Sequence, residues 1–308
     1  MPNFETEKKQ YFVGIEGGGT KFNCIIANHP DDVFETTRIP TTDPDETLDH
    51  IITFIKNFQN EFQIKAIGLG TFGPLDINKK SPNYGKISKT TKPGWSNFDI
   101  LGKLKDKLPF PIALDTDVNA AALGEHLWGA GQNLESLVYL TIGTGIGGGV
   151  IINGKPIHGL LHPEMGHLLI PLSPQSDSPQ GICPYHNNCL EGIASGPAIE
   201  SIWGQSPEDL PEDHPAWILE AEYLAKGLMN IILAISPQKI ILGGGVMKKP
   251  GLLELIRENI LALLNDYVQH SSITNSIDTY ILPPALGDFS GRYGAVALAS
   301  EIYLAQGV

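Results

Sequence analysis

The pattern of hydrophobic and polar residues predicts that the chain contains two copies of one α/β design. Residues 11–29 (YFVGIEGGGTKFNCIIANH) and 137–155 (LVYLTIGTGIGGGVIINGK) each read as an apolar strand, a turn of glycine and threonine, and a second strand. Each hairpin is followed by a helical spacing of apolar residues, a short buried strand and a group of glycines. The repeat predicts two α/β domains, residues 1–120 and 121–308.

The second half differs from the first by an insertion at about residues 155–215, which is rich in Pro, His and Ser. Long irregular stretches in compact domains are usually functional or mobile. We also expect the C-terminal helix, about residues 292–308, to pack back on the first domain. The length of 308 residues and the hydrophobic content of 42% are enough for two such domains.

Charge and composition exclude several classes of function. The formal net charge is −13, and the 21 Lys and Arg residues form no basic block, so we expect no nucleic-acid partner. We find no apolar run of about 18 residues and no secretory pattern at the N-terminus, which predicts a cytoplasmic protein without a membrane partner. Three cysteines favour thiol or metal chemistry over a disulfide framework.

The glycine-rich stretch at 141–150 (TIGTGIGGGV) matches several nucleotide-binding patterns. The spacing Gly143-x-Gly145-x-x-Gly148 is that of a dinucleotide fingerprint, but a strand rather than a helix follows it. A protein-kinase loop fits the local pattern, although the kinase catalytic motifs do not occur, and a Walker A loop fails where Pro156 replaces Ser or Thr. A plain glycine hairpin without a ligand stays open.

The pairing of two hairpins favours a functional interpretation. Each offers backbone N–H groups and one threonine hydroxyl, from Thr20 and Thr144, that could hold phosphate from opposite sides.

Six motifs in order resemble one known family: GIEGGGTK, DVNAAALGE, TIGTGIGGGVIINGK, HPEMGH, CPYHNNCLEG and ILGGG. Together they are similar to the ROK family of sugar kinases, over about residues 11–300. The resemblance implies an α/β, two-domain actin-like or hexokinase-like (ribonuclease H-like) ATPase fold with a cleft between the domains. It also implies ATP and Mg²⁺ as cofactors, ADP as a product, a hexose as substrate and a homodimer as the assembly.

Phosphoryl transfer needs a base beside the attacking hydroxyl. Asp117, between a β-rich run and an Ala-rich helix start, is our candidate general base, and the family motif has its proton-accepting Asp there. Two alternatives stay open: Asp117 caps the helix, or Asp115, two residues earlier, is the base.

The resemblance also implies the groups that bind the two substrates. Asn119, Glu164, Glu191 and His167 match positions that bind sugar hydroxyls, and the loop GTFGPLD places Gly73 and Pro74 on the sugar side. A glutamate without a role is the usual alternative for any single Glu. The implied nucleotide-binding residues are Gly17, Gly18, Gly19, Thr20, Lys21, Thr141, Gly143, Thr144, Gly145, Gly196, Pro197, Gly243, Gly244 and Gly245.

A metal site is indicated independently of the sugar. Cys183-x-x-His186-x-x-Cys189 supplies three ligands within seven residues, and His167 could complete a Cys₂His₂ shell typical of structural zinc. Related zinc-binding kinases have three cysteines with this histidine, so His186 is a departure. His162 is a reserve ligand, and we expect Cys24 to be a buried core thiol.

On the nucleotide side, Glu16 stands where most relatives have Asp, and its longer side chain suits binding of Mg²⁺ through water. The strand end ILGGGV (241–246) would let adenosine lie close to backbone, with a plain strand-to-helix turn as the alternative.

The run Lys-Pro-Gly-Trp at 92–95 resembles fructose-phosphorylating members, although Trp95 could also be an apolar anchor. We therefore predict an ATP-dependent fructokinase that phosphorylates the 6-hydroxyl of D-fructose, with mannose or glucose as alternative substrates. A sugar-responsive transcriptional regulator of the same family is disfavoured, because only ten residues precede the first hairpin and the chain is acidic.

Overall fold

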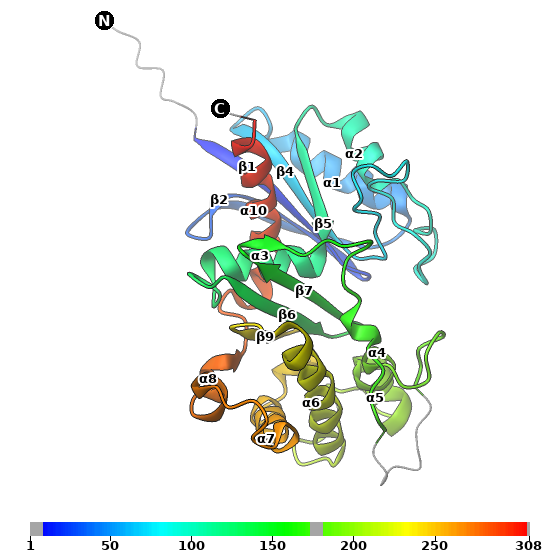
Figure 1. The fold of residues 1–308 in the computed structure, drawn as a ribbon. Coiled ribbons are helices and arrows are strands. Elements are labelled where there is room, and N and C mark those ends of the chain that lie inside the picture. The colour runs from blue at the N-terminus through cyan, green and yellow to red at the C-terminus, as the bar shows by residue number, and fades with distance from the viewer. Residues whose placement is uncertain (1–8, 173–180, 307–308) are drawn as a thin grey trace, which may run out of the picture. The chain divides into compact units, whose positions relative to one another are not determined.

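A computed structural model describes residues 9–172 and 181–306, which fall into two compact units. The first unit contains residues 9–128, 158–162 and 289–306, and the second contains 129–157 and 163–288, without 173–180. Each unit is a mixed α/β structure built on one five-stranded sheet (Figure 1). The mixed α/β class predicted from the hydrophobic pattern is confirmed.

The first unit has the sheet order β3-β2-β1-β4-β5. Strands β1 and β2 form the first predicted hairpin, β2 and β3 pair antiparallel, and β4 and β5 extend the sheet in parallel from β1. The strands are β1 (Gln10–Gly17), β2 (Lys21–His29), β3 (Asp32–Pro40), β4 (Gln63–Thr71) and β5 (Ile112–Thr116).

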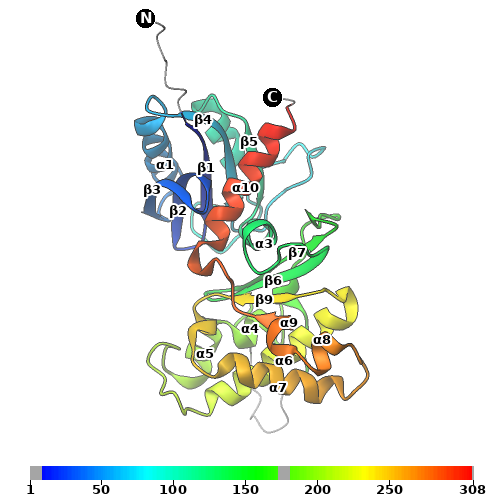
Figure 2. The same ribbon diagram turned by 90° about the vertical axis from the view of Figure 1, so that its left-hand side faces the viewer.

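Helices cover both faces of this sheet. Helix α1 (Pro44–Phe58) begins at its N-cap Asp43, whose side chain accepts the N–H of Asp45, and it buries the apolar stripe of Leu48, Ile51, Ile52 and Ile55. Helix α2 (Ile100–Lys107) packs in the same apolar cluster. Helices α3 (Asp117–Trp128) and α10 (Ser290–Leu304) lie together, as Figure 2 shows, and α10 packs on β1, β2 and β4.

Glycines allow α3 and α10 to approach closely. A Cβ on Gly124 would lie 2.8 Å from the backbone nitrogen of Gly294, and a Cβ on Gly68 of β4 would lie 2.9 Å from that of Ala299. A Cβ on Gly70 of β4 would lie 2.7 Å from the Cβ of Ala120, so the first turn of α3, where Asp117 and Asn119 lie, is also close to the sheet of the first unit.

The second unit repeats the same topology, with the order β8-β7-β6-β9-β10. The antiparallel pair β6 and β7 is the second predicted hairpin, and β9 and β10 run parallel to β6. The strands are β6 (Ser136–Ile142), β7 (Ile146–Ile152), β8 (Lys155–Pro156), β9 (Ile240–Gly243) and β10 (Ile281–Leu282).

The helices of the second unit bury a large apolar cluster against this sheet, and α6 and α7 supply much of it. The α-helices are α4 (Leu190–Ala194), α5 (Gly196–Trp203), α6 (Ala216–Ile235), α7 (Leu252–Leu264), α8 (Ser271–Thr274) and α9 (Ile277–Tyr280). Short 3₁₀ helices are η1 (Met165–His167), η2 (Val246–Lys248) and η3 (Gly287–Phe289), the last across the boundary of the units.

In the described ranges, no helix combines the length and the apolar character that a membrane span requires. The stretch predicted as an irregular insertion, 155–215, contains β8, η1, α4 and α5, so it is more regular than its composition indicated. Residues 173–180 of that insertion lie outside the described residues.

Candidate active site and metal centre

The predicted catalytic residues of the first unit lie where β5 passes into α3. Thr116, the last residue of β5, accepts the backbone N–H of Asn119 on its Oγ1 atom at 3.2 Å and so caps the helix. Asp117 opens the first turn, is half-buried, and accepts the N–H of Val118 at 3.0 Å. The capping role weighed for Asp117 therefore belongs to Thr116.

Asp115, the alternative base, lies in a different environment. Its side chain is 2% exposed. Its Oδ1 atom accepts the N–H of Thr116 and the side-chain amide of Asn119, both at 2.7 Å, and its Oδ2 atom lies 2.7 Å from Nε2 of His158. Because both oxygens are occupied by protein donors, Asp115 is poorly placed to take a substrate proton.

The first glycine loop projects from the β1–β2 hairpin. The N–H of Gly18 donates to the carbonyl of Lys21 at 2.9 Å. Thr41 donates its backbone N–H to the carbonyl of Thr20 and its hydroxyl to the carbonyl of Gly18, and these bonds fix the shape of the loop. Gly19 and Thr20 are exposed and Lys21 is half-buried. The loop therefore has the open main chain that phosphate binding requires.

Glu16, the predicted magnesium residue, precedes this loop on β1. Its Oε2 atom accepts the side-chain amide of Asn23 at 2.8 Å and lies 3.9 Å from Nε of Arg292. The guanidinium offsets part of the negative charge that would attract a cation.

The loop with Gly73 and Pro74 is held by side chains of the same unit. The Gly73–Pro74 peptide is cis, and the N–H of Leu75 donates to Nε2 of His162 at 3.2 Å. His162, the reserve metal ligand, is thus not in the metal cluster, and the structure corrects that prediction.

Trp95 is an apolar anchor in the core of the first unit, which was one of the two interpretations of its motif. It is fully buried, stacks on Phe22 at 5.5 Å between ring centroids, and donates its indole N–H to the carbonyl of Thr42 at 3.0 Å. Lys92, Pro93 and Gly94 line a neighbouring pocket of about 400 Å³.

In the second unit, three of the predicted nucleotide-binding segments meet. The N–H of Gly143 donates to Gly145 at 2.9 Å, and the N–H of Gly196, at the start of α5, donates to the carbonyl of Gly143 at 2.8 Å. A Cβ on Gly143 would lie 3.9 Å from the nitrogen of Gly245. Glycines after β6, after β9 and at a helix N-terminus form one open backbone surface, a common arrangement for phosphate.

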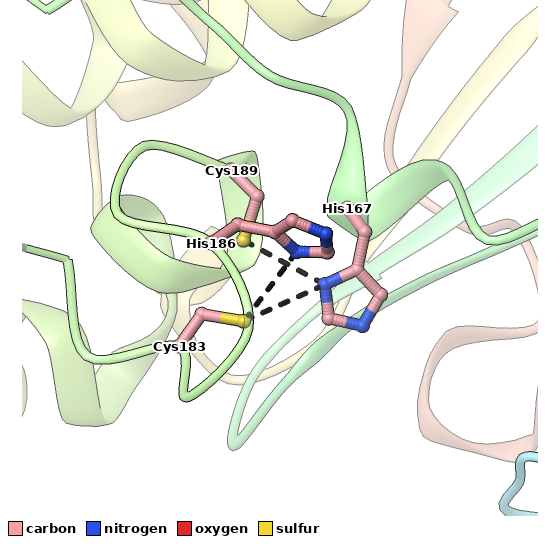
Figure 3. Close-up of side chains that lie close together, drawn as sticks. All are labelled: His167, Cys183, His186 and Cys189. Carbon is pink, nitrogen blue, oxygen red and sulfur yellow. Dashed lines mark hydrogen bonds between the residues drawn. The ribbon is translucent and has the colours of Figure 1, made fainter.

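Four predicted ligands come together at the metal centre, as Figure 3 shows. The ligand atoms of His167, Cys183, His186 and Cys189 all lie within 4.8 Å of one another. Nδ1 of His167 lies 3.6 Å from Sγ of Cys189 and 3.9 Å from Sγ of Cys183, which in turn lies 3.7 Å from Nδ1 of His186.

These separations fit a tetrahedral ion. Usual zinc–sulfur and zinc–nitrogen bond lengths place neighbouring ligand atoms about 3.6 Å apart. Two thiols and two imidazoles are also a donor set that zinc prefers. Burial raises the pKa of the Cys189 thiol to about 11, and a bound cation would oppose this shift by binding the thiolate.

Backbone pairing explains why distant ligands meet. The carbonyl of Leu168 accepts the N–H of Leu190, and the N–H of Ile170 donates to the carbonyl of Asn188. The segment after His167 therefore runs beside the segment with Cys189. The N–H of Gly192 donates to Sγ of Cys189 at 3.3 Å. The third thiol, Cys24, is fully buried in the first unit as predicted, and burial raises its pKa to about 12.

Both predicted sugar-binding glutamates flank this centre. Glu191 accepts the N–H of Ile146 at 2.9 Å and lies 4.0 Å from Nε2 of His167. Glu164 is exposed at the start of η1, where its carbonyl accepts the N–H of His167 at 3.0 Å.

One polar contact was not predicted from the sequence, the pair of Asp115 and His158. The two residues are 43 positions apart, and no local spacing relates them.

Comparison with known proteins identifies relatives over almost the whole length. The model of the ROK family matches residues 12–302. The fructokinase of Lactococcus lactis subsp. cremoris is 42% identical over 294 residues, 95% of this chain and 98% of the relative. The fructokinase of Zymomonas mobilis is 41% identical over 295 residues, 94% of this chain and 97% of the relative.

Solved structures agree on the fold. The ROK hexokinase of Thermus thermophilus is 28% identical and superposes with a TM-score of 0.78, with 96% of this chain and 99% of that chain covered. A ROK family glucokinase from Streptomyces griseus, solved with glucose and AMPPNP, is 24% identical with a TM-score of 0.75, covering 94% and 99%. The predicted actin-like, hexokinase-like fold is confirmed.

Proposed function

This chain belongs to the ROK family, and we propose that it is an ATP-dependent fructokinase that transfers the γ-phosphate of ATP to the 6-hydroxyl of D-fructose. The observation that carries the proposal is the 41–42% identity to two fructokinases over almost the whole of each chain. The chain is a sugar kinase, and ATP and fructose are its proposed substrates.

The base in this proposal is Asp117. It accepts the proton of the sugar hydroxyl as that oxygen attacks the γ-phosphorus, and ADP leaves. Two features support Asp117 over Asp115. Asp117 is half-buried, whereas the side chain of Asp115 is only 2% exposed. Asp117 also lies in the first turn of α3, where the helix dipole favours the carboxylate.

Backbone amides hold the phosphates in this proposal. In the first unit, the phosphates are bound by the loop of Gly17, Gly18, Gly19, Thr20 and Lys21. In the second unit, they are bound by Thr141, Gly143, Thr144, Gly145, Gly196 and Pro197. The strand end Gly243–Gly245 lies beside adenosine. Because Asn23 and Arg292 already engage Glu16, we propose that Glu16 meets Mg²⁺ through water.

The metal centre has a structural role in this proposal. His167, Cys183, His186 and Cys189 would hold one zinc ion, which would tie the segment around His167 to the segment that carries Glu191. Glu164, Glu191 and His167 bind hydroxyls of the sugar, and so do Asn119 and the Gly73–Pro74 loop. The proposed place of action is the cytoplasm, and a homodimer is the proposed assembly.

One experiment tests the reaction and the base together. ADP release is measured with Mg-ATP and fructose, mannose, glucose, N-acetylglucosamine or N-acetylmannosamine as acceptor. Fructose should give the highest kcat/KM. Asp117→Asn should lower kcat by about 10²- to 10⁴-fold, while the exposed control Asp49→Asn should not.

Each alternative has its own signature in this experiment. A higher kcat/KM for glucose or mannose would replace fructose as the substrate. Full activity of Asp117→Asn, with loss in Asp115→Asn, would move the base to Asp115.

A further inference from the structure

Asp115 lies at the centre of a polar cluster in the first unit. Its two oxygens receive a backbone N–H from Thr116, a side-chain amide from Asn119 and the Nε2 atom of His158, each at 2.7 Å. A carboxylate only accepts hydrogen bonds, so each of these three partners must present an N–H donor to Asp115.

This fixes the orientation of the Asn119 amide. The NH₂ group must point to Asp115, and the carbonyl oxygen therefore points the other way. Asn119 is fully buried, and its Oδ1 atom has no hydrogen-bond partner among the described residues. A buried carbonyl oxygen without a donor is unfavourable, so a bound group that donates a hydrogen bond would relieve it.

We propose that His158 is a positioning residue that acts through Asp115 on Asn119, so that Asn119 presents its carbonyl oxygen to a hydroxyl donor of the sugar. The inference rests on the proposed function. It adds that Asn119 is an acceptor and selects sugars with a donating hydroxyl at that position. A sugar that lacks this hydroxyl leaves Oδ1 unpaired.

His158 is well placed to stiffen this cluster. It comes from residues 158–162, a short stretch that belongs to the first unit although its neighbours in sequence belong to the second. His162, four residues later, accepts the N–H of Leu75, so the stretch is attached to the first unit at both ends. His158 is 43% exposed and Asp115 is 2% exposed, so the pair has one side toward solvent.

The charge of His158 adds to its hold on Asp115. The hydrogen bond with Asp115 raises the pKa of His158, while desolvation and the charge of Lys79 lower it. Tyr84 also faces Asp115, and its pKa is raised, mainly by burial and further by this carboxylate. A raised pKa means that the contact with Asp115 favours the protonated, charged form of His158. The interaction with Asp115 therefore weakens as the pH rises through that pKa and His158 loses its charge.

The test compares two substitutions of the same residue. His158→Leu removes the donor to Asp115, and His158→Gln keeps an N–H donor of similar reach. We expect His158→Leu to raise the KM for fructose about three- to tenfold with kcat and the KM for ATP changed less than twofold, and His158→Gln to restore most of the affinity. The exposed His50→Leu is the matched control and should leave both KM values unchanged.

A second readout identifies the atom pair. Fructose analogues, each lacking one hydroxyl, are assayed with the wild type and with His158→Leu. For one analogue the two proteins should have nearly equal KM, because the hydroxyl that Asn119 accepts is already missing. In the wild type the KM for fructose should rise as pH passes the raised pKa of His158, and in His158→Gln this step should vanish.

The inference fails if the KM for fructose in His158→Leu equals that of the wild type, or if the variant loses affinity for every analogue by the same factor. It also fails if His158→Gln is as impaired as His158→Leu while both melt at the wild-type temperature. Absence of fructose phosphorylation by the wild type would instead refute the proposed function.

Discussion

The imidazole of His167 lies between Glu191 and the other metal ligands: Oε1 of Glu191 is 4.0 Å from Nε2 of His167, whose other ring nitrogen, Nδ1, is 3.6 Å from Sγ of Cys189. Carboxylates that approach the outer nitrogen of a ligating histidine orient the ring and make it a stronger ligand. Glu191 therefore has two tasks in the proposed site, since it also stands among the groups proposed to bind the sugar.

This relationship predicts a change in metal affinity. Glu191→Gln should weaken zinc binding about 10- to 100-fold, because the neutral amide no longer supports the imidazole. Competition with a chromophoric chelator measures it. Glu200→Gln, exposed on α5, is the control. Equal zinc affinity in both variants would mean that Glu191 does not support His167.

The metal content itself is a second prediction. Elemental analysis of protein purified without chelator should find about one zinc per chain, and Cys189→Ser should lose it, because a serine hydroxyl is a much poorer zinc ligand. The buried Cys24 is the matched control, since Cys24→Ala removes a thiol outside the cluster and should retain zinc. Wild-type protein without zinc would contradict the assignment of the four ligands.

The loop after β1 gives a third prediction, which separates glycines needed for packing from glycines needed for a ligand. A Cβ on Gly17 would lie 2.9 Å from Oγ1 of Thr71 and would meet the ring of Phe22, whereas a Cβ on Gly19 would meet nothing within 4 Å. Gly17→Ala should therefore lower the free energy of unfolding by about 1–3 kcal/mol.

Gly19→Ala should leave that free energy almost unchanged and raise the KM for ATP about tenfold, by disturbing one phosphate contact. Urea unfolding and initial rates at saturating fructose measure the two effects. If Gly19→Ala leaves the KM for ATP unaltered, the loop does not bind the nucleotide.

The sequence predicted those parts of the fold that depend on local patterns. The two glycine hairpins became β1–β2 and β6–β7, and the helical spacings before the glycine groups became α1 and α6. The four metal ligands were found because three of them lie within seven residues and their chemistry is restrictive.

Other features depended on contacts between distant residues. The hydrogen bond between Asp115 and His158 joins β5 to the stretch after β8, and no local sequence pattern relates the two residues. For the same reason the sequence left His162 as a reserve metal ligand, although in the structure its ring accepts the N–H of Leu75.

A fourth prediction concerns Glu220, a buried acid of α6. Trp217, Tyr223 and Leu224, three or four positions away on the same helix face, belong to the apolar cluster of the second unit. Its Oε1 atom has no hydrogen-bond partner among the described residues, and desolvation raises its pKa well above 4.5. In the unfolded chain this carboxyl ionises near the ordinary value, while in the folded chain it stays protonated to higher pH. Ionisation therefore favours unfolding, and stability is lost as pH rises from about 4.5 to the raised pKa.

Glu220→Met should remove this loss, because a thioether of similar length needs no proton and no hydrogen-bond partner. The variant should be about 1–3 kcal/mol more stable than the wild type at pH 7, with a smaller gain at pH 4. Urea unfolding at both pH values measures the difference. Glu222→Gln, whose partner Lys226 lies 2.7 Å away on the same helix, should instead lose at most about 0.5 kcal/mol. A gain for Glu220→Met that is equal at pH 4 and pH 7 would show that the carboxyl ionises normally in the folded protein.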